Sequence, residues 1–352
     1  MWKKIINTVL LSGALLLIIC PPAMSNFYVV AGSRGIGTKI QSLPYTISNP
    51  GFYYIAKNLS CAAGNHGITI AADNVTIDLM GFTLTGPGNS GSSHGIYVEE
   101  QSNIEIRNGS IEEFAGSGVL INDEIGNLDQ SDRILNIRCL NNNGNGLYIA
   151  ASNSQIKSCS VSGNTLSGIV AGSYSTVEGC AVFDNHSTGI SGSQGMSITG
   201  NTCADNGGNG IGAGSGSSII GNTCDHNTLS GIDAHNGSTL SGNTCYQNQS
   251  DGITVEDGAT VTGNTCYENT KDGINTNGGC TIESNTCHTN GDEGIQAGPS
   301  STVINNTCRL NTGNGIYLEG NNLVDRNTAV GNGTDMNVCA TCTFIINHTT
   351  AP

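Results

Sequence analysis

The sequence predicts an all-β protein built as a parallel β-helix, a solenoid of about twelve stacked coils. Cysteine, asparagine and apolar residues all recur with a step of 21 over the second half of the 352-residue chain. This step suits a coil of three short strands, and repeated glycines and β-branched residues disfavour helices. The clearest rows are Cys203, Cys224, Cys245, Cys266, Cys287 and Cys308, then Asn201, Asn222, Asn243, Asn264, Asn285, Asn306 and Asn327, and then Ile198, Ile219, Leu240, Val261, Ile282, Val303 and Val324.

The unit from Gly252 to Asp272 shows how one coil is expected to fold. Ile253 and Val255 enclose a polar residue, which is the period-two pattern of a strand with one buried face. Val261 and Cys266 are each flanked by threonines or other polar residues and should point inward from two further strands. Stacking such units at the usual strand spacing of roughly 4.8 Å places equivalent residues above one another. Stacked asparagine amides can then bond to each other along the solenoid.

The cysteines are expected to serve mainly as core residues. Cys139, Cys159 and Cys180 are interpreted as an upstream extension of the cysteine row, giving nine members. Two cysteines stacked directly on parallel strands have poor geometry for a disulfide, so the row should consist of free thiols. Cys339 and Cys342 are different, because they lie close together near the end of the chain and can form a small disulfide there.

The chain resembles the right-handed β-helix proteins of the pectate-lyase-like superfamily. The resemblance covers residues 58–332, and the segments Asp73–Leu79 and Gly81–Leu84 are similar to the first coils of secreted bacterial members. It implies a single-stranded right-handed parallel β-helix. It implies less about activity, because the superfamily includes lyases, hydrolases, epimerases, phage tailspikes and non-catalytic surface proteins.

The two ends of the chain have separate interpretations. Residues 1–25 form a signal peptide, with basic residues followed by an apolar run and a cleavage site after Ser25. Lipidation of Cys20 is the alternative, although Ile19 occupies a position where a lipoprotein signal has a small residue. Residues 26–57 and 333–352 are expected to cap the exposed strand edges of the solenoid. The mature chain is therefore predicted to be extracellular, periplasmic or attached to the cell surface, without spanning a membrane.

Charge narrows the choice of partner. After removal of Lys3 and Lys4 with the signal peptide, ten basic residues remain against 27 acidic ones, a net charge of −17. Such a surface repels nucleic acid, and also polyuronates unless cations bridge the charges. A neutral polysaccharide or cell-surface glycan meets no such penalty.

The resemblance implies that ligands bind the groove outside the strand that begins with a repeated Gly-Ile pair. Asp251, Asp272 and Glu293 precede this pair in three successive coils, so their carboxylates should line up and provide an acid–base pair or a cation site. A solvated turn is the structural alternative, and Tyr246 with Tyr267 on another face is a rival site for stacking on sugar. The flanking residues expected to bind substrate are Asp233, His235, Glu256, Lys271 and Tyr317.

A second acidic segment is a possible calcium site. The loop at 122–132 is about seven residues longer than its counterpart in the regular coils, and inserted loops of solenoids often form binding edges. Carboxylates are the ligands that calcium prefers, and a bare solvated loop is the alternative. The acids concerned are Asp123, Glu124, Asp129 and Asp132.

Two functional classes remain open. The first is a secreted protein that binds or modifies polysaccharide along the groove, which as an enzyme would be a lyase, a glycoside hydrolase or an epimerase. The second is a non-catalytic surface or adhesion scaffold. The motifs by which the superfamily's polygalacturonases are recognised do not occur in the sequence. The preference for the first class therefore rests on the resemblance.

Overall fold

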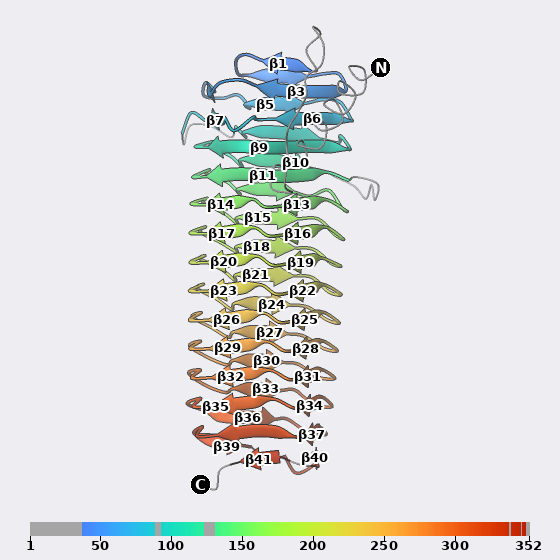
Figure 1. Ribbon diagram of the computed structural model, residues 1–352, viewed down its shortest axis with the longest axis vertical. Helices are drawn as coiled ribbons and strands as arrows, with labels where there is room; N and C mark the ends of the chain where they lie inside the picture. Colours follow the sequence, from blue (N-terminus) through green and yellow to red (C-terminus); the bar gives the residue numbers. More distant parts are fainter. Residues whose placement is uncertain (1–36, 89–92, 123–130, 338, 346, 350–352) are drawn as a thin grey trace, which may run out of the picture. The chain divides into compact units, whose positions relative to one another are not determined.

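The chain folds into a parallel β-solenoid (Figure 1). The computed structural model describes residues 37–88, 93–122, 131–337, 339–345 and 347–349, and the predicted signal peptide at 1–25 lies outside these ranges. All regular structure in the described ranges is β-strand. The described residues contain no helix that is long and apolar enough to cross a membrane. The all-β prediction is confirmed.

Two sheets make up the solenoid. Within the described residues the smaller sheet has fourteen strands, one per coil, which confirms the predicted count of about a dozen coils. Its strands are β2 (Tyr45–Ile47), β5 (Ile68–Ile70), β8 (Ile96–Glu99), β10 (Val119–Asn122), β12 (Leu147–Ile149), β15 (Ile169–Ala171), β18 (Ile190–Gly192), β21 (Ile211–Ala213), β24 (Ile232–Ala234), β27 (Ile253–Val255), β30 (Ile274–Thr276), β33 (Ile295–Ala297), β36 (Asn314–Leu318) and β39 (Thr334–Met336).

The larger sheet has 27 described strands in two arms, which join where β9 and β11 run through both. The first arm, with these two, contains β1 (Thr38–Ile40), β3 (Gly51–Ile55), β6 (Val75–Asp78), β9 (Ile104–Glu112), β11 (Arg133–Leu140), β13 (Gln155–Lys157), β16 (Thr176–Glu178), β19 (Ser197–Thr199), β22 (Ser218–Ile220), β25 (Thr239–Ser241), β28 (Thr260–Thr262), β31 (Thr281–Glu283), β34 (Thr302–Ile304), β37 (Leu323–Asp325) and β40 (Thr343–Phe344). The second arm adds β4 (Leu59–Ser60), β7 (Thr83–Thr85), β14 (Ser160–Ser162), β17 (Ala181–Phe183), β20 (Thr202–Ala204), β23 (Thr223–Asp225), β26 (Thr244–Tyr246), β29 (Thr265–Tyr267), β32 (Thr286–His288), β35 (Thr307–Arg309), β38 (Asn327–Val330) and β41 (Asn347–Thr349).

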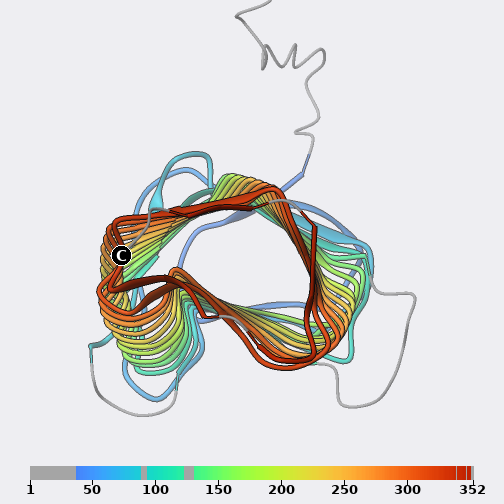
Figure 2. The same ribbon diagram turned by 90° about the horizontal axis from the view of Figure 1, so that it is seen from below.

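Each regular coil therefore contributes three short strands to three faces. β27, β28 and β29 are the strands predicted for the unit that begins at Gly252. Successive coils lie nearly over one another when viewed along the solenoid (Figure 2). The stacking also includes strands inside both segments predicted as caps, since β1 pairs with β3 and β38 pairs with β41.

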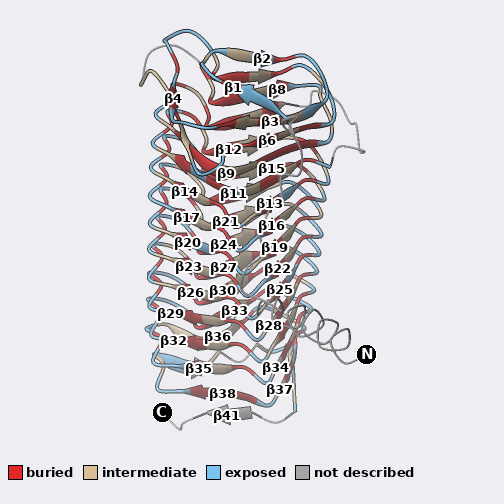
Figure 3. Ribbon diagram, turned by 45° about the horizontal axis from the view of Figure 1, so that its top comes forward, coloured by how far each residue is buried: buried red, intermediate tan, exposed pale blue. Residues whose placement is uncertain are grey.

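The core is a set of stacked inward rows, and buried residues run through every coil (Figure 3). Ile253, Val261 and Cys266 are all 0% exposed, one from each strand of their coil. Their neighbours one coil away are equivalent residues, so each buried side chain packs between near copies of itself. The predicted inward placement of the isoleucine and cysteine rows is confirmed.

The buried asparagines form ladders along the solenoid. The Oδ1 atom of Asn264 accepts hydrogen bonds from both the backbone N and the Nδ2 of Asn243, each at 2.9 Å. Its own Nδ2 donates to Leu240 O at 3.1 Å and to Asn285 Oδ1 at 3.0 Å. One side chain thus satisfies donors and acceptors on three coils. The predicted asparagine ladder is confirmed.

Replacing Asn264 with alanine should destabilise the protein by about 1–3 kcal/mol, because buried donors and acceptors lose their partners. Chemical denaturation of the variant and the parent measures this difference. Asn277→Ala is the matched control, since Asn277 is exposed on a turn. Equal losses in the two variants would contradict the proposed importance of the ladder.

The cysteine row differs from the prediction at its upstream end. The strand register places Val182 beside Cys203 and Val161 beside Val182. Cys139 then pairs with Val161. The row therefore contains seven cysteines interrupted by two valines, and the prediction of nine was wrong.

Cys159 and Cys180 instead belong to the first asparagine row. The backbone N of Cys180 donates to Asn201 Oδ1 at 2.9 Å, and the backbone N of Cys159 donates to Cys180 Sγ at 3.4 Å. The Cys180 thiol donates to Ile156 O at 3.8 Å, much as Asn201 Nδ2 donates to Val177 O at 3.0 Å. The two thiols thus replace amides in the ladder. The irregular sequence steps of 20 and 23 residues were the signal for this change of row.

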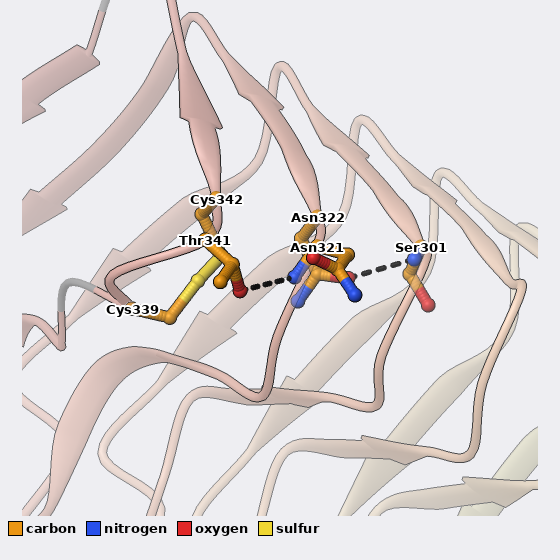
Figure 4. The surroundings of a disulfide bond; sticks show 6 residues. All are labelled: Ser301, Asn321, Asn322, Cys339, Thr341 and Cys342. Atoms are coloured by element: carbon orange, nitrogen blue, oxygen red, sulfur yellow. Dashed lines mark hydrogen bonds between the residues drawn. A yellow bond between two sulfur atoms is a disulfide. The ribbon is translucent and has the colours of Figure 1, made fainter.

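The predicted terminal disulfide joins Cys339 to Cys342 (Figure 4). Between them, Thr341 Oγ1 accepts a hydrogen bond from the backbone N of Asn321 at 3.0 Å, which ties this turn to the preceding coil. The other cysteines in the described ranges are buried free thiols. Burial raises the pKa of core thiols such as Cys245 well above the ordinary value. The structure thus has a disulfide at the terminal pair where one was expected, and free thiols along the core row.

Candidate functional site

Eleven strands of the smaller sheet begin directly after a glycine, and β36 includes the equivalent glycine as its second residue; each of these twelve glycines is followed by an apolar residue and preceded by a polar one. We call these twelve polar residues the acceptor row. Its members are His66, His94, Ser117, Asn145, Ser167, Thr188, Asn209, Ser230, Asp251, Asp272, Glu293 and Asn314.

Side chains of the acceptor row hold the coils together. Asn145 Oδ1 accepts a hydrogen bond from the backbone N of Ser167 at 3.0 Å, and Asn209 Oδ1 accepts one from Ser230 N at 3.0 Å. The same bond from side chain to the next backbone N–H occurs after His66, His94, Ser117, Asp251 and Asp272. At these seven positions the side chain therefore provides an acceptor atom to the next coil, and several residue types do so.

The three acids predicted as catalytic are consecutive members of this row. Asp272 N donates to Asp251 Oδ1 at 3.0 Å, and Glu293 N donates to Asp272 Oδ1 at 2.9 Å. Asn314 Nδ2 donates to Glu293 Oε1 at 2.8 Å. Asp251 is 7% exposed and Asp272 is 5% exposed. The structure brings the three carboxylates together as expected, and their catalytic role stays a prediction.

Two hydroxyl groups orient the first of these acids. Thr254 Oγ1 donates to Asp251 Oδ2 at 3.1 Å. Thr254 Oγ1 also lies 3.2 Å from Ser230 Oγ, within hydrogen-bonding distance. Ser230 was not singled out from the sequence, although its position before a Gly-Ile pair was the available signal.

Asp272 is the acid in this group whose pKa departs furthest from its ordinary value. Its pKa is raised from 3.8 to about 7, mainly by burial and also by the neighbouring acids Asp251, Glu293 and Asp292, against the lowering effect of the hydrogen bond from Glu293 N. Burial also raises the pKa of Glu293. A carboxyl group that titrates near neutral pH can both give and take a proton, which is the property required of a general acid or base.

The same acids can also share a cation. One oxygen from each of Asp272, Asp292 and Glu293 lies within 4.8 Å of the other two. Carboxylate oxygens are the ligands that calcium prefers. A bound cation and a shared proton are two ways to offset the repulsion among these charges.

The predicted substrate-binding residues spread over the same sheet face. In register, one outward row runs through Asp233, Thr254, Asn275, Gln296 and Tyr317. Asn209 Nδ2 donates to Asp233 Oδ2 at 3.2 Å, and burial raises the pKa of Asp233. Asp233 and Tyr317 are four coils apart, roughly 19 Å at the usual strand spacing, so they can contact only different parts of an extended ligand.

The remaining predicted residues lie at the two edges of this face. His235 and Glu256 follow the strands at the edge opposite the acids, with 3.9 Å between His235 Nδ1 and Glu256 Oε2. Lys271 is exposed on the turn directly before Asp272. His235 and Glu256 lie close enough to Asp233 to affect its pKa, whereas Tyr317 is four coils away from Asp233, so the structure does not gather all the predicted residues into one cluster.

The rival aromatic site forms a stack. The rings of Tyr246 and Tyr267 are 4.9 Å apart and 1° from parallel, and His288 covers the other face of Tyr267 at 5.0 Å. His226 meets the Tyr246 ring edge-on at 6.0 Å. Both faces of Tyr267 are therefore occupied, which leaves only its edge for a sugar.

The predicted calcium loop lies largely outside the described residues, including Asp123, Glu124 and Asp129. Asp132 is described, and it is 0% exposed. Its Oδ1 accepts a hydrogen bond from Ile104 N at 2.8 Å. Asp132 thus has a structural contact with the neighbouring coil, and the calcium site stays a prediction.

The titration of Asp272 should make the protein more stable in mild acid than in mild base. Because its pKa is raised from 3.8, the contribution is full below about pH 4 and is lost as the pH rises through about 7. Allowing for solvent screening, the difference between about pH 5 and pH 8 is about 1–2 kcal/mol. Urea unfolding of the parent and of Asp272→Asn at both pH values isolates the contribution of Asp272 to the free energy of unfolding, because the other titrating groups are common to both proteins. An unchanged pH dependence in the variant would contradict the assignment.

Comparison with known proteins gives consistent results for the fold. The family described as the right handed beta helix region matches residues 41–191, 94–239, 174–281 and 212–351 in overlapping segments. The A-module of mannuronan C-5 epimerase AlgE6 of Azotobacter vinelandii is a similar structure, at 14% identity over 90% of this chain and 89% of that one, with a TM-score of 0.52. The AlgE4 A-module of the same organism gives 14% identity, 88% and 89% coverage, and a TM-score of 0.51.

Pre-mature gene product 12 of bacteriophage phi29 is also similar, at 13% identity over 86% of this chain and 53% of that one, with a TM-score of 0.52. No curated protein sequence matches the chain. At these identities the solved structures support the fold alone. Because the family matches extend over most of the chain, the protein belongs to the right-handed β-helix family.

Proposed function

We propose that this protein is exported and binds or modifies a polysaccharide that lies along the outer face of the smaller sheet. The observation that carries the proposal is the hydrogen-bonded series Asp251, Asp272 and Glu293, in which Asp272 titrates near neutral pH. This series borders a row of polar outward side chains on the same face. Extended binding faces of this kind are common on solenoids.

The chemistry would divide between the two rows. Thr254, Asn275 and Gln296 provide hydroxyl and amide groups, one per coil, for hydrogen bonds to sugar hydroxyls. Asp272 would transfer a proton to or from the sugar, with Asp251 and Glu293 as its acidic neighbours. Hydrolysis, elimination and epimerisation each need such a transfer. Calcium bound by Asp272 and Glu293 would instead bridge these acids to an acidic sugar.

A non-catalytic surface scaffold is the second candidate function. The observation in its favour is that Asp251 and Asp272 do the same structural work as Asn145 and Asn209, accepting a hydrogen bond from the next coil. A carboxylate at this position therefore needs no ligand to explain it. The two candidates differ in whether the charge of these acids matters.

A polysaccharide screen on the purified chain from residue 26 tests the proposal. Neutral and acidic polysaccharides are assayed with calcium and with a chelator, for binding on an array, for new reducing ends and for unsaturated products. The proposal predicts binding or turnover with at least one polysaccharide that depends on Asp272. Absence of binding and turnover across the panel would favour the scaffold.

Export has its own test. Expressed from its full gene in a bacterium, the protein should appear outside the cytoplasm with Asn26 as its first residue, because cleavage after Ser25 is expected. N-terminal sequencing and intact mass measurement read this directly. A mature chain that begins with a lipid-modified Cys20 would establish the alternative, and an uncleaved cytoplasmic chain would contradict export.

A further inference from the structure

The acceptor row begins with two histidines that the proposed function does not use. His66 precedes β5 and His94 precedes β8, in neighbouring coils. Their rings stack with centroids 5.2 Å apart and planes 10° from parallel. Tyr97 stacks on His66 at 4.4 Å. This arrangement places two titratable rings at positions where the later coils have serine, threonine, asparagine or an acid.

Both rings accept hydrogen bonds through Nδ1. His94 N donates to His66 Nδ1 at 3.1 Å, and Ser117 N donates to His94 Nδ1 at 2.8 Å. Since the backbone N–H is the donor in each case, Nδ1 must be unprotonated, and each neutral ring has its proton on Nε2. Protonation would add a hydrogen to Nδ1, so that donor would face donor.

The surroundings of the two rings oppose protonation. The pKa of His94 is lowered to about 4, mainly by burial and also by His66, against a raising effect of the Ser117 backbone. Burial also lowers the pKa of His66. The groups packed nearby are the neutral Tyr97 ring and the thiol of Cys61, which donates to His66 O at 3.5 Å. Residues 89–92, which shortly precede His94, include no ionisable side chain.

We propose that mild acid weakens the contacts between the coils of β5, β8 and β10 by protonating His66 and His94. This is a property of the fold and does not depend on the proposed function. We call the hydrogen-bonded contact between two neighbouring coils a joint. The joint between β5 and β8 contains the bond to His66, and the joint between β8 and β10 contains the bond to His94. In an open state each ring is hydrated and can take a proton without losing a bond.

The direction of the effect follows from the lowered pKa values. At neutral pH both rings are mostly uncharged in the closed and in the open state. Below about pH 6.5 the open state binds protons more readily, so the opening constant rises as the pH falls toward about 4. Between about pH 7 and pH 5 the rise should be about tenfold or more. Joints made by Asn145 and Asn209 have no titrating acceptor and should not respond.

Amide hydrogen exchange, corrected for the intrinsic pH dependence of exchange, tests the proposal in the full mature protein. The amides of His94 and Ser117 should lose protection between about pH 7 and pH 5 by about tenfold or more. The amides of Ser167 and Ser230 are the internal controls, because they donate to asparagine side chains in the same row. A parallel loss at all four amides, or no loss at any, would overturn the proposal.

The double variant His66→Asn with His94→Asn provides the matched comparison. Asparagine already fills this position at Asn145 and Asn209, so the variant keeps an acceptor that does not titrate. It should retain protection at neutral pH and lose the acid response. An acid response of the same size in the variant would overturn the proposal. NMR of the parent protein tests the proposal without any substitution. Both histidine rings should have an unprotonated Nδ1 and a pKa below the ordinary value. Rings that are protonated at about pH 6 would contradict the proposal.

Discussion

Replacing Ile253 with aspartate should destabilise the protein severely, by roughly 4 kcal/mol or more. Ile253 is 0% exposed and lies between Ile232 and Ile274 of the neighbouring coils. A carboxylate there would be buried between apolar side chains with no partner. The expected result is a large fall in melting temperature, or a failure to fold, measured by circular dichroism.

Thr260→Asp is the matched control for this prediction. Thr260 lies on the next strand of the same coil, beside the buried Val261, and is itself only half-buried. The same change of charge at this outward position should leave the melting temperature nearly unchanged. If Ile253→Asp and Thr260→Asp behaved alike, position 253 would not belong to the core.

The double substitution Asp251→Asn with Asp272→Asn should reduce polysaccharide binding or turnover on the order of a hundredfold. Asparagine keeps the acceptor oxygen that bonds to the next coil, as Asn145 and Asn209 do, but removes charge and the exchangeable proton. The fold should therefore be retained, and stability should stay equal or rise because two like charges are lost.

Glu283→Gln is the control for this double variant. Glu283 ends β31 on a different face of the solenoid, so its charge should not affect the ligand. Affinity, turnover and melting temperature of the three proteins are compared on the polysaccharide identified by the screen. Full activity in the double variant, or an equal loss in Glu283→Gln, would remove the acids from the site.

The sequence alone was sufficient to predict the coil and its inward rows. A fixed step of 21 residues places Ile232, Ile253 and Ile274 in register, and strand alternation then decides which side of each strand is buried. The alignment of Asp251 with Asp272 followed for the same reason. The spacing of 21 residues could not predict which atoms these carboxylates contact, because those contacts depend on the path of the turn before each strand.

Where the step changes, prediction from the sequence fails. His66 and His94 are 28 residues apart, so their stacking could not be inferred from a period of 21. Cys159 and Cys180 lie in the asparagine row although their residue type suggests the cysteine row, because only the irregular spacing distinguishes the two rows here. The closed stack of Tyr246 with Tyr267 was also missed, since sequence spacing does not tell whether ring faces are covered.

Hydroxyl-radical footprinting of the protein with its bound polysaccharide tests the central claim most directly, because it reports solvent access to tyrosine and histidine side chains. Tyr317 and His235 belong to the proposed face, whereas Tyr246 and Tyr267 lie on the second arm of the larger sheet. The account predicts that the polysaccharide protects Tyr317 and His235 from oxidation and leaves the two stacked tyrosines unchanged. Protection of Tyr246 and Tyr267, with Tyr317 and His235 still oxidised, would contradict it.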